Sequence, residues 1–210
     1  MASWTEWFIS AKEKNIPLEK YLCIDQPKDL ERLYSSGLPC SKLILLSGLE
    51  YNSSTAKEFI SSFPLVWTRI IDKSSGKRRS MLRIKSFNEF CAFVESLEFN
   101  LSQSVIQLYE MEENALGGNV LTSGGKTLIE IIFGDQDTVA KSREPFFHGK
   151  INSLGRLEFV EKNVPNKIFE GSLKVLSYLK KSRNSYLEGY FEFVVSDKEN
   201  VFFLDYKTKF

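Results

Sequence analysis

Two hydrophobic patterns divide the chain near Pro64. Three stretches before it carry apolar residues at the spacing of an amphipathic helix: 3–15, 25–35 and 54–63. A short apolar run at 21–24 predicts a strand. After Pro64, short runs of β-branched and aromatic residues alternate with turn residues, which is typical of β-hairpins. The sequence therefore predicts an α+β fold in which helices pack on antiparallel sheets.

The same change of pattern predicts two small lobes. We expect a helical or α+β lobe over residues 1–63 and a hairpin-rich α+β region over residues 64–210, with one continuous domain as the alternative. Ser86 and Glu89 form a capping box that opens a helix, and a second helix begins at Pro165. The predicted hairpins join 65–71 to 79–85, 118–123 to 126–133, 146–152 to 156–162, and 189–196 to 201–207.

The bulk composition argues against several classes of protein. The 210 residues carry 28 basic and 27 acidic side chains, and a net charge of +1 disfavours a dedicated nucleic-acid binder. No apolar run reaches the ~20 residues that a membrane span needs. Cys23, Cys40 and Cys91 are far apart, so neither a disulfide framework nor a zinc site is expected. Reduced thiols and the lack of a secretory signal pattern predict a cytoplasmic protein.

The last hairpin contains the most informative pair of charged residues. Glu192 interrupts the apolar run YFEFVVS, and Asp205 interrupts VFFLDYK. A tight turn at residues 197–200 would place these two carboxylates opposite each other, where they repel unless a cation bridges them. Mg²⁺ takes one or two carboxylates together with phosphate oxygens, so the pair is a candidate metal site. From spacing alone, the alternative is that one acid faces solvent beside Lys207.

The first hairpin carries two basic candidates. Arg69 lies in PLVWTRII and Arg83 lies in MLRIK on the returning strand. A guanidinium in an apolar strand either faces water or meets an anion, because an unpaired buried charge is costly. The two arginines could bind phosphate from one face of the sheet, or both could be exposed on its solvent side.

Two further polar residues stand out because their immediate neighbours are apolar or uncharged. Glu130 interrupts the apolar run TLIEIIF. His148, the only histidine, is a candidate phospho-acceptor or base, although a lone histidine is more often structural.

The chain has neither a GxGxxG nor a GxxxxGK[ST] motif, which disfavours Rossmann and P-loop sites.

The order of these pieces resembles the nucleotide-binding region of the ATP-grasp superfamily from Pro64 to the C-terminus, about two-thirds of the chain. That family has a hairpin with a basic phosphate ligand, a strand that ends in an adenine-contacting hinge, a central hairpin, and a final hairpin with two Mg²⁺-binding acids. The segments that resemble these pieces are PLVWTRII, SVIQLYEME, GGNVLTSGGKTLIEIIFGD and FEFVVSDKENVFFLDYK. The central hairpin looks most like that of phosphoenolpyruvate synthase-type ATP-binding domains.

The resemblance implies a function for particular residues. Arg69 and Arg83 would hold the phosphates of ATP, and Glu192 with Asp205 would hold Mg²⁺. The hinge residues would contact adenine: Gln107, Leu108, Tyr109 and Glu110.

Two departures from the family pattern bear on the metal site and the phosphate loop. The turn of the first hairpin has only Gly76 where members carry a glycine-rich loop. Lys207 stands where many members carry an asparagine, so it could either replace the charge of a second metal ion or abolish metal binding.

Two functions from different classes remain open. The first is an ATP- and Mg²⁺-binding protein that phosphorylates a carboxylate-type acceptor, as a ligase or a phosphotransferase. The second is a non-catalytic binding or assembly module without nucleotide, which predicts a protein partner or a homo-oligomer; Lys207, the single Gly76 and the short chain favour it. A binder of single-stranded nucleic acid is a weaker third option, against which the nearly neutral net charge argues.

Overall fold

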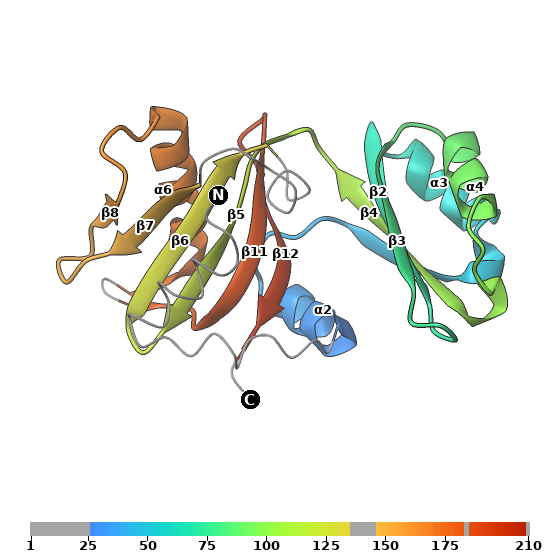
Figure 1. Cartoon of the computed structure of the whole chain (residues 1–210), viewed down its shortest axis with the longest axis horizontal. Coiled ribbons are helices and arrows are strands. Elements are labelled where there is room, and N and C mark those ends of the chain that lie inside the picture. Colours follow the sequence, from blue (N-terminus) through green and yellow to red (C-terminus); the bar gives the residue numbers. More distant parts are fainter. Residues whose placement is uncertain (1–25, 135–145, 183–184, 209–210) are drawn as a thin grey trace. The chain divides into compact units, whose positions relative to one another are not determined.

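The computed structural model describes residues 26–134, 146–182 and 185–208 (Figure 1). The helix expected over 3–15 and the strand expected over 21–24 lie outside these residues. Helices packed on antiparallel sheets make up the described chain, which confirms the α+β class. The chain divides into two compact units: a small unit, Ser41–Glu113, and a large unit made of the described parts of residues 1–40 and 114–210.

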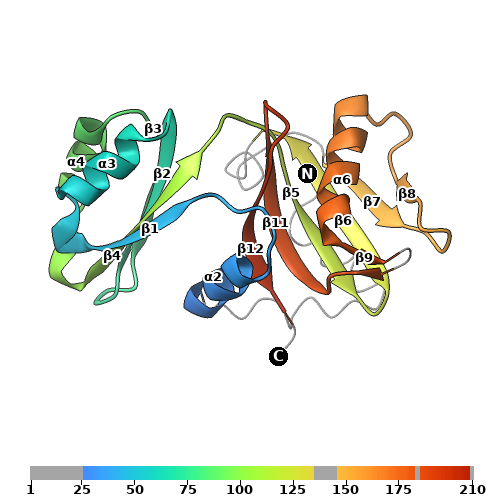
Figure 2. The same ribbon diagram turned by 180° about the vertical axis from the view of Figure 1, so that it is seen from behind.

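The small unit is a four-stranded antiparallel sheet in the order β1-β4-β2-β3, covered on one face by two helices (Figures 1 and 2). Its strands are β1 (Leu43–Ser47), β2 (Leu65–Asp72), β3 (Arg78–Ile84) and β4 (Ser104–Met111). Its helices are α3 (Ser54–Ser61) and α4 (Phe87–Glu95), with short 3-10 turns η2 (Gly48–Glu50) and η3 (Leu101–Gln103).

Alternating burial along the strands places the core of the small unit between the sheet and its helices. Val66, Thr68 and Ile70 of β2 are buried, whereas the residues between them are partly exposed. The predicted cap of α4 is confirmed, since the Ser86 side chain accepts from the Glu89 N–H. The Glu89 carboxylate accepts from the Lys85 N–H instead of closing the capping box.

The lobe boundary expected at residues 63 and 64 falls inside the small unit. The two sides of that position belong to one sheet, because β1 pairs with β4 in antiparallel register. Helix α3 also contributes Ala56 and Ile60 to the core that β2 lines. The division of the chain therefore follows the pairing of distant strands.

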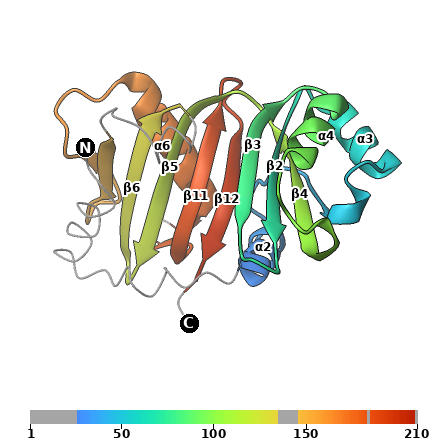
Figure 3. The ribbon, with the colours of Figure 1, turned by 45° about the vertical axis from the view of Figure 1, so that its right-hand side comes forward.

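The large unit is built on a six-stranded antiparallel sheet in the order β12-β11-β5-β6-β7-β8. Its strands are β5 (Asn114–Ser123), β6 (Lys126–Phe133), β7 (Phe147–Ile151), β8 (Leu157–Phe159), β11 (Gly189–Ser196) and β12 (Val201–Lys207). Its helices are α2 (Gln26–Ser35) and α6 (Asn166–Leu179), and β9 (Lys180–Ser182) pairs with β10 (Ser185–Tyr186). Strands β6, β5, β11 and β12 lie side by side in Figure 3, with α6 behind them.

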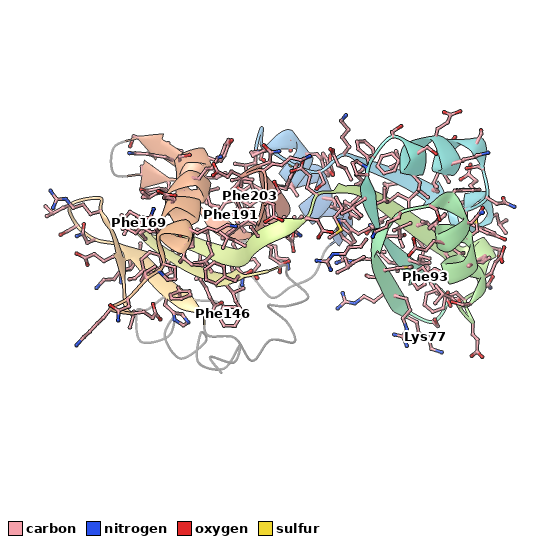
Figure 4. The ribbon with its side chains drawn as sticks, turned by 90° about the horizontal axis from the view of Figure 1, so that it is seen from above. Lys77, Phe93, Phe146, Phe169, Phe191 and Phe203 are labelled. Atoms are coloured by element: carbon pink, nitrogen blue, oxygen red, sulfur yellow. The ribbon has the colours of Figure 1, made fainter. Side chains whose placement is uncertain are left out.

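One face of this sheet forms the main core. Phe191 and Phe203 lie on the same side of the sheet as α6 (Figure 4). Phe191 stacks on Tyr206, with ring centroids 4.6 Å apart. The core also contains Val120, Ile129, Ile131, Ile168, Val175, Leu176 and Leu179.

All four predicted hairpins are confirmed, as β2–β3, β5–β6, β7–β8 and β11–β12. Gly124 and Gly125, with φ of 57° and 75°, form the two-residue turn that joins β5 to β6. In the part of the chain that the structure describes, no helix has the length and apolar character needed to cross a bilayer.

Candidate functional site

Glu192 and Asp205 are direct cross-strand partners on β11 and β12. The pairing predicted from the sequence is thus confirmed, although a bulge contributes to it. Phe193 pairs with Phe203, and the next pair is Glu192 with Asp205, so Leu204 is an extra residue on β12. The bulge allows Phe203 to enter the core while Asp205, two residues later, faces the opposite side with Glu192.

Two neighbouring side chains hold this acid pair. Like charges placed directly opposite on a sheet repel, and Lys207 offsets the repulsion by an ion pair of 2.9 Å between its Nζ and Asp205 Oδ2. The Tyr190 hydroxyl lies 3.0 Å from Glu192 Oε1. Burial, reinforced by the Glu192 charge, holds the pKa of Tyr190 well above its usual value, so the hydroxyl stays protonated and donates. The Lys207 Nζ also lies 5.5 Å from the centre of the Tyr190 ring.

The acid pair continues into a row of polar side chains that crosses the sheet. Glu192 pairs with Asn119 of β5, Asn119 pairs with Glu130 of β6, and Glu130 pairs with His148 of β7. Direct partners in antiparallel strands project from the same face, so all these side chains lie on the face opposite the Phe191 core. Asn119 and Glu130 are each 5% exposed.

His148 lies between two carboxylates at the end of this row. Its Nε2 is 3.3 Å from Glu130 Oε1 and its Nδ1 is 2.8 Å from Glu161 Oε1. The His148 backbone N–H donates to Glu161 Oε2 at 2.9 Å. The hydrogen bond to Glu130 and then that to Glu161 raise the pKa of His148 above its usual value, against the opposing effect of burial. A protonated imidazole satisfies both carboxylates, whereas a neutral one has a single N–H.

The donor set at Glu192 and Asp205 fits Mg²⁺ in one specific way. Carboxylate oxygens are hard donors, and Mg²⁺ is bound through one or two of them together with substrate phosphates. Among the described residues, no three His, Cys, Asp or Glu side chains gather into a metal site. The pair would therefore hold Mg²⁺ only together with phosphate oxygens, with Lys207 already contacting one oxygen of Asp205.

In the small unit, the predicted basic residue Arg69 lies on the sheet face opposite the helices. Arg69 pairs with Gln107 of β4, and the next pair on the same face is Trp67 with Tyr109. The Trp67 and Tyr109 rings stack with centroids 3.9 Å apart, and the Arg69 guanidinium carbon lies 5.4 Å from the Trp67 ring. The Tyr109 hydroxyl donates to Gln107 Oε1 at 3.1 Å. Three predicted site residues thus share this face: Arg69, Gln107 and Tyr109.

The other predicted residues of the small unit have different surroundings. The Leu108 side chain belongs to the hydrophobic core, so only its backbone could contact a ligand. Glu110 lies at the end of β4, where it accepts from the Lys42 N–H. Arg83 is part of the irregular register of β3, has a φ of 56°, and forms a half-exposed ion pair with Glu113 at 3.0 Å.

Sequence reasoning missed several residues of the polar row that runs from the acid pair to His148. Tyr190, Asn119 and Glu161 were not identified, and no partner was assigned to His148. One signal was present: the Gly124-Gly125 turn fixes the register of its hairpin and thereby places Asn119 opposite Glu130. The pairing of β5 with β11 and of β6 with β7 has no such local signal, because it depends on the order of strands in the sheet.

Comparisons with known proteins find likeness in structure alone. A scan of protein-family models gives no match, and a search of curated proteins gives no significant relative. Solved structures similar to this chain include a RiPP-associated ATP-grasp ligase from Chryseobacterium gregarium in complex with ADP and a leader and core peptide (15% identity, 90% of this chain, 53% of that chain, TM-score 0.46). D-alanyl-alanine synthetase A from Vibrio cholerae is another (10% identity, 85% of this chain, 54% of that chain, TM-score 0.44).

A third similar structure is the macrocyclase MdnC from Microcystis aeruginosa, bound with precursor peptide MdnA (15% identity, 87% of this chain, 51% of that chain, TM-score 0.44). This chain spans about half the length of each of these proteins. The likeness concerns the fold alone, since the TM-scores are below 0.5 and the identities are 10–15%. Of these three structures, one is named as an ATP-grasp ligase, one as a synthetase and one as a macrocyclase.

Proposed function

We propose that the chain binds ATP together with Mg²⁺, and that it is an ATP-grasp-like ligase or phosphotransferase acting on a carboxylate-type acceptor. One observation carries the proposal: Glu192 and Asp205 face each other as direct partners across β11 and β12. Opposed carboxylates repel, and a divalent cation bound to phosphate turns that repulsion into attraction.

The residues of the large unit have distinct functions in this proposal. Glu192 and Asp205 hold Mg²⁺, which when bound neutralises charge on the phosphates. Lys207 supplies one fixed positive charge beside the pair, in place of a second metal ion. Catalysis would come from positioning and from charge neutralisation rather than from a covalent step on the protein.

The small unit, taken by itself, carries candidate nucleotide contacts of its own. Arg69 is the stronger phosphate candidate, because its guanidinium lies on a sheet face beside Trp67 and Gln107. Arg83 is the weaker candidate, since it already pairs with Glu113. The adenine contact is assigned to the segment from Gln107 to Glu110, with Leu108 contributing its backbone alone.

The 2.9 Å ion pair between Lys207 and Asp205 favours a second candidate function. If the ammonium group takes the place of the metal ion, the chain is a non-catalytic ATP-grasp-like module that binds a protein partner or a second copy of itself. The two candidates differ in how Lys207→Ala changes ATP binding. If Lys207 neutralises phosphate charge, Lys207→Ala should weaken ATP binding about tenfold or more, because hydrogen bonds to charged groups contribute about 1.5–3 kcal/mol.

A thermal shift assay tests the ATP-binding proposal. ATP with Mg²⁺ at a hundred times the dissociation constant adds about 2.7 kcal/mol of stability, which corresponds to roughly 5–10 °C for a chain of this size. The same ATP with EDTA should give a much smaller shift, because the opposed carboxylates then repel the phosphates. Equal melting temperatures with and without millimolar ATP and Mg²⁺ would remove the proposal, and light scattering would then test the assembly module.

A further inference from the structure

A continuous chain of polar contacts links Glu192 of the acid pair to His148, three strands away in the sheet order. The Tyr190 hydroxyl lies 3.0 Å from both Glu192 Oε1 and Asn119 Oδ1, so its single proton is shared between two acceptors. The Asn119 side-chain amide points its Nδ2 at Glu130 Oε2, 3.5 Å away. Beyond Glu130, the contact with His148 Nε2 completes the chain.

Burial makes this chain of contacts rigid. Tyr190 is 3% exposed, and Asn119 and Glu130 are each 5% exposed. A buried polar atom that loses its partner destabilises the folded state, so these side chains are confined to the rotamers that keep their contacts. The groups also determine one another's orientation, because turning the Asn119 amide would bring its oxygen towards the Glu130 carboxylate.

His148 anchors the far end of the row. A carboxylate as buried as that of Glu130 needs a cationic partner, and a protonated His148, whose Nε2 lies 3.3 Å from Glu130 Oε1, would provide one. The Glu161 carboxylate contacts the Nδ1 atom of the His148 ring and accepts a hydrogen bond from the His148 backbone N–H. These two contacts fix the orientation of the ring. Other charged groups nearby are Lys150 and Glu158, which pair with each other at 3.9 Å.

We propose that this row positions the Glu192 carboxylate for metal binding, with Tyr190 and Asn119 as positioning residues and His148 as the anchor. The proposal rests on the function proposed above, since it concerns the same metal pair. Residues that orient a metal ligand commonly change metal affinity about 10–100-fold when they are mutated. The row thereby extends the metal site from the β11–β12 hairpin to the opposite half of the sheet.

The test measures, in the full chain, the Mg²⁺ concentration that half-saturates the Mg²⁺-dependent part of ATP binding. Tyr190→Phe removes one oxygen atom and should raise that concentration about tenfold. His148→Gln should raise it by a smaller factor, and Lys150→Gln, on the same strand and face, should leave it unchanged. ATP affinity without Mg²⁺ should stay constant in all three variants, which a general loss of structure would not allow.

A second readout needs no nucleotide. In the unliganded chain, His148→Gln should shift the NMR signals of the Asn119 side-chain amide, and Lys150→Gln should not. If wild-type protein shows Mg²⁺-dependent ATP binding that Tyr190→Phe leaves intact, the positioning inference is overturned and the proposed function stands. If wild-type protein shows no Mg²⁺-dependent binding, the proposed function falls and the positioning role falls with it. Should His148→Gln fail to fold, Tyr190→Phe decides alone.

Discussion

At the scale of single residues, the charge of His148 depends on two neighbouring carboxylates. Both of its ring nitrogens contact carboxylates, and one of those carboxylates, Glu130, is almost fully buried. The sequence indicated that Glu130 was unusual, because it interrupts an apolar strand, but gave no partner for it. The structure supplies that partner, and the bonds to Glu130 and Glu161 raise the pKa of His148.

A raised pKa makes the contribution of His148 to stability depend on pH. The folded protein holds the proton more tightly than the unfolded chain, so the contribution is complete below the usual histidine pKa of about 6.5 and is lost as pH rises through the higher folded-state value. We predict that the free energy of unfolding of wild type exceeds that of His148→Gln most at pH 5–6. Urea titrations of both proteins from pH 5 to pH 9 measure this difference, and a difference that is constant with pH would contradict the prediction.

At the scale of elements, close approach of strands determines where the polar row lies. Gly118 precedes Asn119 on β5, and a Cβ there would overlap the Glu130 backbone oxygen and lie 2.8 Å from Phe193 Cζ. The core side of β5 can therefore approach β6 and β11 only because this position has no side chain. The result is the register in which Asn119 faces Glu130.

We predict that Gly118→Ala lowers the free energy of unfolding by about 3 kcal/mol, because backbone atoms of β6 would have to move. Gly124→Ala is the matched control in the same hairpin: it meets no atom within 4 Å and costs only the strain of its positive φ, about 1 kcal/mol. Chemical denaturation measures both values. Equal losses, or a larger loss in Gly124→Ala, would mean that the contact at Gly118 does not constrain the sheet.

Local patterns predicted the hairpins but not how they assemble. The Gly124-Gly125 turn, the Ser86 cap and the facing acids of the last hairpin each depend on residues close in sequence. The bulge at Leu204 was not visible, because the four apolar residues VFFL precede Asp205 without an alternating pattern. Asn119 was overlooked because its place in the row depends on Glu192, which comes from a strand far along the chain, although its other neighbour, Glu130, lies in the same hairpin.

At the scale of the whole molecule, the small unit is an insertion in the sequence of the large one. The chain passes from the large unit to the small unit after Cys40 and returns at Asn114. The change of pattern at Pro64 marks a change of local structure within the small unit and not its boundary. Each unit has its own hydrophobic core, so the proposed contacts in each can be tested by separate substitutions.

The central claim is that Glu192 and Asp205 together hold Mg²⁺ that is bound to ATP, and calorimetric titration of ATP in the presence of Mg²⁺ tests it most directly. Glu192→Gln and Asp205→Asn keep the size of each side chain and remove one charge, so each should weaken ATP binding at least tenfold with Mg²⁺ and should not weaken it with EDTA. Glu158→Gln, an exposed acid on β8, should bind like wild type in both conditions. ATP binding with Mg²⁺ that is unchanged in both acid-pair variants would contradict the claim.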